Sequence, residues 1–406
     1  MATIIYHHRT RANGAEGVHI RGIQNGFREL GYEITDMSLF RIDSESPAPG
    51  DTARPGGFKK ALLNAVASYL PNVLFKLLEV LYNCRTFLAG RRVLSACIAK
   101  KTLPELIYER YAYFSFAMAF LAQKFHVPFV LEVNTTCLDY DVREIRLRWL
   151  ARKIERYVFD KATLLVVVST YLKEKIRQEY QIPEHRIIVT PNAVDPRRFA
   201  SVAPPELDQR FDQARRFAQG KIVIGFVGMF VPWHGLDFLL DIFLRLIREA
   251  PLNVRLGLLL VGDGPVRRII EEKITANALT DAVFITGAVP HDEIKAYLDL
   301  FNIAIMPDSN PFGSPMKIFE YMTMGKPVVA PAYGPILEII TQGETGLVFT
   351  PKDHTACLNA ILELIENAGL RNRLGEKART LVLTEHTWQR NVERIIERLQ
   401  SCQTTM

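Results

Sequence analysis

Cysteine is scarce in this sequence, and the cysteines that are present form no recognisable pattern. The chain of 406 residues has an odd number of them, and they are Cys84, Cys97, Cys137, Cys357 and Cys402. Their separations match neither the close pairs of a zinc site nor the framework of a disulfide-stapled domain. We therefore expect a reduced, cytoplasmic interior and no bound metal.

Long apolar runs are missing as well. No stretch reaches the ~18 uninterrupted apolar residues that a membrane-spanning helix requires. The first residues, MATIIYHHRTR, turn polar too soon for the apolar core of a signal peptide. The sequence thus predicts a cytoplasmic protein and leaves open a peripheral contact with the inner face of the cytoplasmic membrane.

An excess of acidic side chains is the third absence. Lysine and arginine number 50 against 44 aspartates and glutamates, which gives a net charge of +6. Such a charge favours anionic partners, and a phosphorylated small molecule, an anionic membrane and nucleic acid all qualify. Nucleic acid is not expected as a partner, because the basic residues lack interleaved stacking aromatics and a known binding motif.

Two helical stretches of the first half combine basic and apolar residues, at 58–101 and 143–161. A Lys/Arg-rich helix with Trp and Leu on its other side can lie in the interface of a membrane. The alternative is a helix with one face in the core and its charges in water, which suits each stretch alone. Two such stretches, together with the net charge, favour contact with an anionic membrane surface.

Apolar runs such as LIYER, LLVVVS and RLGLLLVGDG alternate with amphipathic helical segments through most of the chain. This alternation predicts parallel sheets covered on both faces, with five or more strands in each half. The expected fold class is therefore α/β, with two doubly wound, Rossmann-like domains. We place the first domain at 1–200, a charged Pro-Pro linker at 201–220, the second domain at 221–384, and a helix that packs back on the first domain at 385–406.

The segment SNPFGSPMKIFEYMTMGKPVVAP, residues 309–331, joins a turn, a short helix and an apolar strand. Ser314 and Pro315 predict a helix start with a serine cap, and Gly325 predicts its end. Lys317 lies in the first turn, where the helix dipole already attracts negative charge, so a bound phosphate would explain it well. The competing interpretation is that Lys317 and Glu320 form an ordinary surface pair at helical spacing.

Other loops after predicted strands suggest the same kind of ligand. Arg9 and Gly14 follow the first strand, and a glycine there allows the backbone to approach a ligand closely. His234 follows the first strand of the second half, and Gly262 lies in a turn after the next strand. Glu338 falls in the first turns of a helix that begins with Gly-Pro. No GxGxxG fingerprint supports a nicotinamide or flavin cofactor.

Taken in order, these motifs resemble a known family. IGFVGMFVPWHGLDFLL, LLLVGDGP, VFITGAVPHDEI, AIMPDSNPFGSPMKIFEYMTMGKPVVAP and GPILEIITQGETGLVF are similar to the donor-binding domain of the retaining glycosyltransferases of family 4, which have the GT-B fold. In the first half, VVVSTYLKEKI and IIVTPNAVDPRRF resemble the stretch that leads to the interdomain linker of that family.

The resemblance implies a nucleotide diphosphate sugar as donor, with a UDP-sugar expected rather than a GDP-sugar, and no other cofactor. It places ribose contacts at Glu320, the base near residues 287–294 and the diphosphate near the first-domain glycine loop. The residues expected to bind the donor are Arg9, Gly14, Gly228, His234, Gly262, Val289, Pro290, Gly313, Ser314, Pro315, Met316, Lys317, Glu320 and Glu338.

The sequence departs from the family at three positions. The arginine and lysine that commonly neutralise the diphosphate are matched here by Met229 and His234, and the first glutamate of a paired motif is matched by Phe312. Lys317 is therefore expected to replace some of that charge, with Arg9 or Arg11 assisting, and Lys317 and His234 are candidate catalytic residues. Glu132 is the candidate base, although the retaining mechanism requires no strong enzymic base.

The function expected on these grounds is sugar transfer to an acceptor hydroxyl, in the assembly of a cell-surface polysaccharide or glycolipid. A lipid-linked or saccharide acceptor would suit the apolar, basic first domain. Two alternatives stay open: a nucleotide-sugar epimerase of the same fold, and a membrane-associated scaffold that has lost catalysis.

Overall fold

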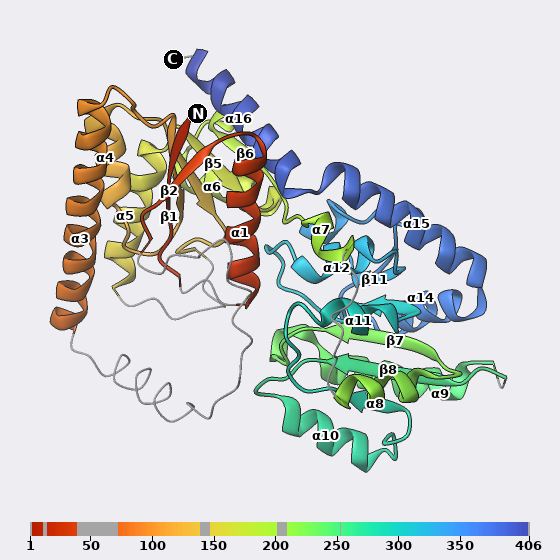
Figure 1. The fold of residues 1–406 in the computed structure, drawn as a ribbon. Helices are drawn as coiled ribbons and strands as arrows, with labels where there is room; N and C mark the ends of the chain where they lie inside the picture. The colour runs from red at the N-terminus through yellow and green to blue at the C-terminus, as the bar shows by residue number, and fades with distance from the viewer. Residues whose placement is uncertain are drawn as a thin grey trace. The chain divides into compact units, whose positions relative to one another are not determined.

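A computed structural model describes residues 2–10, 14–38, 72–138, 147–200, 209–251 and 253–404 of the chain. The chain forms two compact units (Figure 1), of which unit 1 comprises Met1–Thr190 with Gln389–Met406 and unit 2 comprises Pro191–Trp388. The division thus differs from the linker predicted at 201–220. Helix α8, Gln209–Ala218, buries Ala214 in the core of unit 2, so that part of the predicted linker belongs to a folded unit.

Unit 1 is built on a six-stranded sheet in the order β2-β1-β3-β4-β5-β6, and every adjacent pair is parallel. Its described elements are β1 (Thr3–His7), α1 (Gly14–Glu29), β2 (Glu33–Asp36), α3 (Asn72–Ala99), β3 (Leu106–Arg110), α4 (Ala117–Phe125), β4 (Phe129–Val133), α5 (Arg148–Lys161), β5 (Leu164–Val167), α6 (Thr170–Tyr180), the short 3₁₀ helix η1 (Glu184–Arg186), β6 (Ile187–Val189) and most of α16 (Trp388–Thr404).

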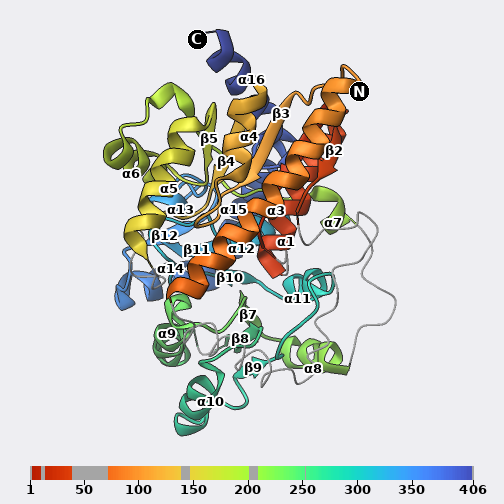
Figure 2. The same cartoon turned by 90° about the vertical axis from the view of Figure 1, so that its left-hand side faces the viewer.

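The helices of unit 1 cover its sheet on both faces. Figures 1 and 2 show α3, α4 and α5 on one side of the sheet and α1 on the other. The Sγ of Cys402 in α16 donates to the carbonyl of His185, 3.1 Å away, so the end of the chain contacts the loop before β6. The apolar strands β3 and β4 are almost wholly buried between the layers, as a doubly wound sheet requires.

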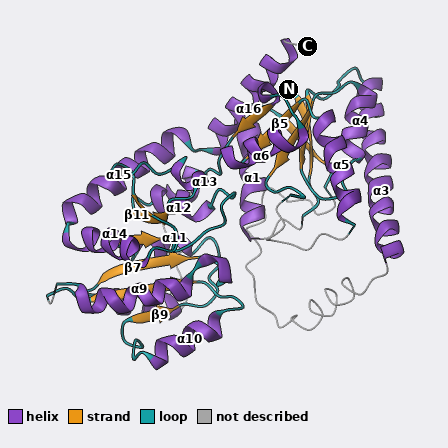
Figure 3. Cartoon of the chain, turned by 180° about the vertical axis from the view of Figure 1, so that it is seen from behind, coloured by secondary structure: helices purple, strands orange, loops and turns teal. Residues whose placement is uncertain are grey.

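Unit 2 also has a six-stranded parallel sheet, in the order β12-β11-β10-β7-β8-β9. Its described elements, coloured by type in Figure 3, are α7 (Pro196–Ala200), α8, β7 (Ile222–Val227), η2 (Pro232–His234), α9 (Leu236–Glu249), β8 (Leu256–Val261), α10 (Arg267–Ala276), β9 (Val283–Ile285), α11 (Ile294–Asp299), β10 (Ile303–Ile305), α12 (Met316–Thr323), β11 (Val328–Pro331), α13 (Gly334–Leu337), β12 (Leu347–Phe349), α14 (His354–Glu366) and α15 (Ala368–Glu385).

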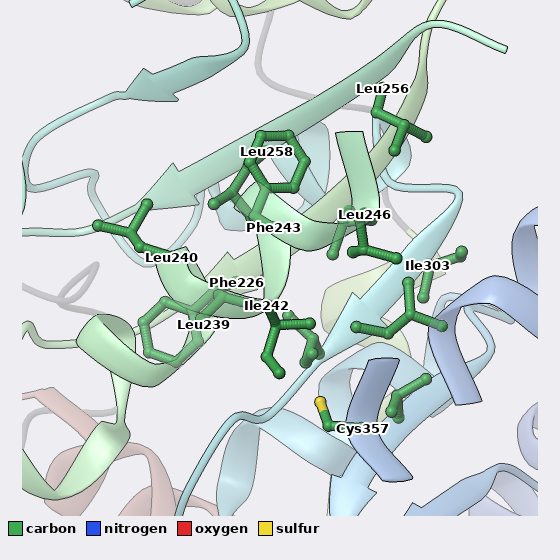
Figure 4. Packing of buried hydrophobic residues seen from close by; sticks show 14 of the residues in the cluster. Phe226, Leu239, Leu240, Ile242, Phe243, Leu246, Leu256, Leu258, Ile303 and Cys357 are labelled. Atoms are coloured by element: carbon green, nitrogen blue, oxygen red, sulfur yellow. The ribbon is translucent and has the colours of Figure 1, made fainter. Parts of the chain in front are cut away.

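The core of unit 2 follows from the period-two pattern of its central strands. Ile224 and Phe226 of β7 point into one apolar layer, and Val223 and Val227 point into the other. Helix α9 buries six apolar residues against the first layer, including Leu239 and Phe243 (Figure 4). Burial of each such side chain contributes ~1.5–3 kcal/mol. The packing of α9 on this layer therefore holds β7, and with it the carboxyl end of the strand, in position. The two doubly wound domains predicted from the sequence are thereby confirmed.

The two basic stretches are only partly covered. Residues 58–71 of the first and 143–146 of the second lie outside the described residues, and the remainder forms α3 and α5. Helix α5 buries Val158 and Phe159 and exposes Trp149 and Lys153, as an amphipathic surface helix does. No helix of the described residues is both long and apolar enough to span a membrane.

Candidate functional site

The strand order of unit 2 indicates where a ligand would bind. Read from β9, the sheet runs β9-β8-β7-β10-β11-β12, so the direction of winding reverses between β7 and β10. In doubly wound sheets ligands bind beyond the carboxyl ends of the strands at this reversal. The segments that leave β7 and β10 here are the loop from Gly228 to His234 and the loop that leads to α12, and both were singled out in the sequence.

The start of α12 differs in detail from the prediction. Pro315, not Ser314, is the residue that precedes the first helical turn, and no side chain caps it. The Ser314 hydroxyl instead accepts a hydrogen bond from the backbone N–H of Asn192, 2.9 Å away. Ser314 thus links this loop by a hydrogen bond to the segment before α7. The predicted helix end is confirmed, because Gly325 follows α12 in the left-handed conformation (φ 64°).

Lys317 is a half-buried cation at the head of α12, and no carboxylate of the described residues lies within ion-pair distance of it. Its Nζ lies 4.1 Å from the centre of the Phe226 ring and 3.4 Å from Nε2 of His234. Burial lowers the pKa of Lys317 to about 7, against an opposing effect of Glu320. The ammonium therefore lies in a partly buried position where a bound anion would stabilise its charge.

His234 is fixed by the backbone on one side and faces Lys317 on the other. Its Nδ1 lies 2.6 Å from the carbonyl oxygen of Met229, an acceptor, which assigns the proton to Nδ1 and leaves Nε2 as the acceptor toward Lys317. Burial lowers the pKa of His234 to about 4, and the neighbouring lysine adds to the effect. His234 is thus neutral at physiological pH, and the positive charge of this cluster resides on the protonated form of Lys317.

Gly228 gives Lys317 the room that it occupies. A β-carbon at Gly228 would lie 2.7 Å from Lys317 Nζ, and the residue has φ 147°, which side-chain-bearing residues rarely adopt. Gly262, after β8, has φ 145°, and a β-carbon there would lie 2.0 Å from the carbonyl oxygen of Gly228. The glycines at the ends of β7 and β8 therefore pack backbone against backbone beneath the lysine.

Glu320 lies one turn further along α12 and faces a different group of residues. It is 5% exposed, and its Oε1 lies 3.4 Å from Nε2 of His291. Burial raises the pKa of Glu320 to about 7, although Arg198 and Lys317 lower it. A pocket of about 210 Å³ opens beside it, lined by Arg198, Phe199, His291, Asp292, Ile294, Lys295 and Glu320.

These positions exclude the simpler interpretation of the lysine and glutamate. Lys317 and Glu320 form no ion pair within 4 Å, and neither is an exposed side chain. Lys317 turns to the β7 loop, whereas Glu320 turns to His291 and the pocket. The two side chains thus belong to neighbouring subsites, one cationic and one that can accept hydrogen bonds in a cavity of nucleoside size. The sequence did not single out His291 or Arg198, although the segment expected near the base, residues 287–294, includes His291.

The loop before α12 holds the position where the family motif has its first glutamate. Phe312 is buried, and Asn310 accepts hydrogen bonds from the backbone N–H groups of Phe312 and Gly313. Asp308 accepts a hydrogen bond from the Tyr333 hydroxyl at 2.9 Å and from the N–H of Ser309. The loop is therefore held by its own side chains, and Phe312 contributes packing rather than charge.

The other predicted residues of unit 2 surround this centre. Val289 and Pro290 follow β9 and precede His291, and Pro315 and Met316 begin α12. Glu338 is the residue at which α13 ends, and it is half-buried. The structure thus brings Gly228, His234, Gly262 and Lys317 into one cluster and Glu320 with His291 into a second.

The predicted residues of unit 1 are engaged within that unit. Arg9 forms two hydrogen bonds with Glu79 of α3, at 2.6 and 2.8 Å, so its charge is already compensated. Gly14 begins α1 with φ 60° and has open space around it. Glu132 is 1% exposed at the end of β4 and contacts Arg110 and His19.

Glu132 is a poor candidate for a base. Besides its ion pairs it accepts hydrogen bonds from the Tyr108 hydroxyl at 2.9 Å and from Asn134 at 2.6 Å. Burial raises the pKa of Glu132, but His19, Arg110 and Asn134 together lower it well below its usual range. A carboxylate this well stabilised in its charged form has little tendency to take up a proton.

Comparison with known proteins adds two family matches. The model described as Glycosyltransferase Family 4 matches residues 16–198, and the model described as Glycosyl transferases group 1 matches residues 208–381. Each model covers most of one half of the chain. Together they support a glycosyltransferase of the GT-B type, in agreement with the motifs.

Individual relatives are distant. The α-D-kanosaminyltransferase of Streptomyces kanamyceticus is 25% identical over 59% of this chain and 60% of its own length. The GDP-mannose-dependent α-(1-6)-phosphatidylinositol monomannoside mannosyltransferase of Mycolicibacterium smegmatis is 25% identical over 62% of this chain and 65% of its own length. The matches thus span less than two thirds of either relative.

A solved structure matches the whole chain. The crystal structure of HepE from Anabaena in complex with UDP has a TM-score of 0.68 and 16% identity, and the match covers 99% of this chain and 100% of HepE. At this level of identity the likeness concerns the fold, and it confirms the predicted GT-B architecture.

Proposed function

We propose that this chain, a GT-B protein with a glycosyltransferase model matching each half, is a retaining glycosyltransferase that moves a sugar from a nucleoside diphosphate sugar to an acceptor hydroxyl. The observation that carries the proposal is the half-buried ammonium of Lys317 at the carboxyl end of β7, with no carboxylate of the described residues within 4 Å of it. A diphosphate would supply the missing negative charge.

The two subsites of α12 bind different parts of the donor, the diphosphate at one and the nucleoside at the other. The first turn of α12 and Lys317 face the diphosphate, because the positive end of the helix and the ammonium both attract it. Glu320 and the pocket beside it receive the nucleoside, and the carboxylate accepts hydrogen bonds from the ribose hydroxyls. UDP is the proposed nucleotide, and the complex of HepE with UDP supports that choice.

Sugar transfer breaks the bond between the anomeric carbon and the diphosphate, so negative charge develops on the leaving group. Lys317 is placed to stabilise that charge, which is the kind of contact that lowers such a barrier most. His234, neutral and anchored to Met229, keeps the ammonium in place. The acceptor proton passes to the departing phosphate oxygen, and Glu132 is not required as a base.

A panel of nucleotide sugars tests the function. UDP-, GDP- and dTDP-sugars are incubated with the protein, and the apparent melting temperature is recorded, because a ligand of the native state raises it. We expect UDP-sugars to give the largest shift. The products formed with and without acceptors are then analysed for anomeric configuration. Turnover of the donor alone to an epimer would contradict the proposal, and so would binding without any transfer or hydrolysis.

The acceptor is proposed to be lipid-linked or a saccharide, in polysaccharide or glycolipid assembly at the cytoplasmic side of a membrane. The matched mannosyltransferase of M. smegmatis acts on a phosphatidylinositol monomannoside, as its name states, which supports an acceptor of this class.

Gly228→Ala should weaken donor binding at least ten-fold. The new methyl group would lie 2.7 Å from Lys317 Nζ, too close for a non-bonded contact, so the ammonium must move from its present position. Gly343→Ala is the matched control, since Gly343 also has positive φ (74°) but nothing within 4 Å of the place where a β-carbon would lie. Both residues have a positive φ that favours glycine, so the control also carries backbone strain, and the melting temperature of each variant is recorded beside its donor affinity. Equal donor affinity in the two variants, measured by calorimetry, would refute the assignment.

A further inference from the structure

Helix α3 of unit 1 turns its polar side chains inward. Asn83 and Thr86 are buried, and Asn83 Nδ2 donates to the carbonyl of Phe114 at 2.9 Å. Glu79 pairs with Arg9, and the Tyr82 hydroxyl lies 3.1 Å from Nε2 of His7. Around Glu79 to Thr86 the side of α3 that packs on the unit therefore serves a polar network at the ends of β1 and β3, whereas further along the helix Leu94 is fully buried.

The opposite side of the same helix is apolar and open to solvent. Leu74, Leu77, Leu81 and Leu88 are 41%, 51%, 54% and 55% exposed. Their spacing of three, four and seven positions puts them on one side of the helix. Leu78 and Val80 flank this row and are about half exposed as well. We call the row of four leucines, together with Leu78 and Val80, the α3 face. In an amphipathic helix of a globular protein, such an apolar side would face the core.

The exposed charged side chains of the described part of α3 are cationic. The exposed basic residues of α3 and the turn after it are Lys76, Arg85, Arg91, Arg92, Lys100 and Lys101. Within the described part of α3 the one acidic residue is Glu79, which is paired with Arg9 on the inward side. Helix α5, on the same side of the sheet (Figure 2), exposes Trp149 near its start with Lys153 stacked on the ring at 5.5 Å.

We propose that the α3 face docks unit 1 on an anionic lipid bilayer. Leucines that enter the acyl boundary, arginines and lysines at headgroup level and an interfacial tryptophan are the components of a surface-bound helix. A second copy of the chain fits less well. In a symmetric dimer the face would meet itself and gather the cations of both copies at one interface, while the described part of α3 offers only the already paired Glu79 as a carboxylate.

The docking is independent of the transfer reaction, so each proposal can fail alone. The test is co-flotation of the full-length protein with vesicles of phosphatidylcholine, with or without about one third phosphatidylglycerol. We expect the wild type to float with the anionic vesicles at low salt and to bind the neutral ones at least ten-fold more weakly. Because salt screens the attraction between exposed cations and anionic headgroups, high salt should reduce the binding.

Two double variants separate the contributions of the α3 face. Leu77→Glu/Leu81→Glu should lower vesicle affinity at least ten-fold, and Arg91→Glu/Arg92→Glu should abolish the preference for anionic lipid. The control is Ile247→Glu/Ile269→Glu, which alters two isoleucines of unit 2 that are 44% and 52% exposed, and it should bind as the wild type does. All four proteins should keep the same melting temperature, because every altered side chain is already exposed.

Three outcomes would overturn the docking proposal. The first is a folded wild type that fails to float with anionic vesicles, and the second is a Leu77→Glu/Leu81→Glu variant that floats equally well. The third is a wild-type dimer in sedimentation velocity that the same leucine variant converts to a monomer without any loss of vesicle binding. That result would assign the α3 face to a contact between copies of the chain.

Discussion

Replacing Lys317 by alanine should lower the rate of sugar transfer by roughly 10²–10³-fold, the range seen when one preorganised group at a developing oxyanion is removed. The loss is expected because no other cation of the described residues lies on this cluster, where His234 is neutral. Steady-state kinetics with a saturating acceptor measure the effect, and calorimetry with the donor alone separates lost binding from lost rate.

The matched control is Lys326→Ala. Lys326 lies just beyond the other end of α12, is also half-buried, and donates from Nζ to the carbonyl of Asp299 at 3.0 Å. Burial lowers its pKa too, so the two lysines differ chiefly in place. We expect Lys326→Ala to cost stability and leave transfer unchanged. Equal activity of the Lys317→Ala variant and the wild type would remove Lys317 from the mechanism.

The pH dependence of donor binding adds an independent readout. Burial lowers the pKa of the free Lys317 to about 7, so the ammonium form that attracts the diphosphate is lost as the pH rises through that value. Donor affinity should therefore decline above pH 7 more steeply in the wild type than in Lys317→Ala, in which Glu320 alone of the two α12 residues still titrates near this pH. The fluorescence of Trp233, exposed beside His234, offers a way to follow the titration.

The central strands of both sheets could be predicted from the sequence, because strands buried on both faces are continuous apolar runs such as LLVV of β5 and LGLLLV of β8. The strands that this pattern missed are β2 and β12. Both lie at the edge of a sheet and span three or four residues, so packing against a neighbouring strand, rather than their own composition, makes them strands.

The candidate site could be predicted in part for a similar reason. Gly228, Lys317 and Glu320 come from local motifs, and the fold brings their loops together at the reversal of the sheet. The partners of these residues were not predictable. His291 reaches Glu320 from a segment about thirty residues away, and Ser314 braces Asn192 instead of capping its own helix. The polar contacts of the inward side of α3 could not be predicted either, because the partners Arg9 and His7 lie far away in the sequence.

Glu320→Gln should abolish most donor binding and, at the same time, stabilise the free protein. Glutamine keeps the shape of the side chain but offers the ribose hydroxyls one neutral acceptor in place of a carboxylate, so we expect a 10–100-fold loss of donor affinity. Because burial raises the pKa of Glu320 from 4.5 to about 7, the folded protein loses stability as the pH rises from 4.5 to 7.

At pH 7.5 that loss is on the order of 3 kcal/mol, and a neutral glutamine avoids it. The melting temperature of the ligand-free variant should therefore exceed that of the wild type at pH 7.5, and the difference should vanish near pH 4.5. Glu366→Gln, which removes an exposed charge of α14, should change neither quantity. A purely structural glutamate would give the reverse result, a less stable variant with unchanged donor affinity. A residue that costs the fold stability and is needed for the ligand is one held in place for binding, because Arg198 and Lys317 only partly offset the burial of the carboxylate in the free protein.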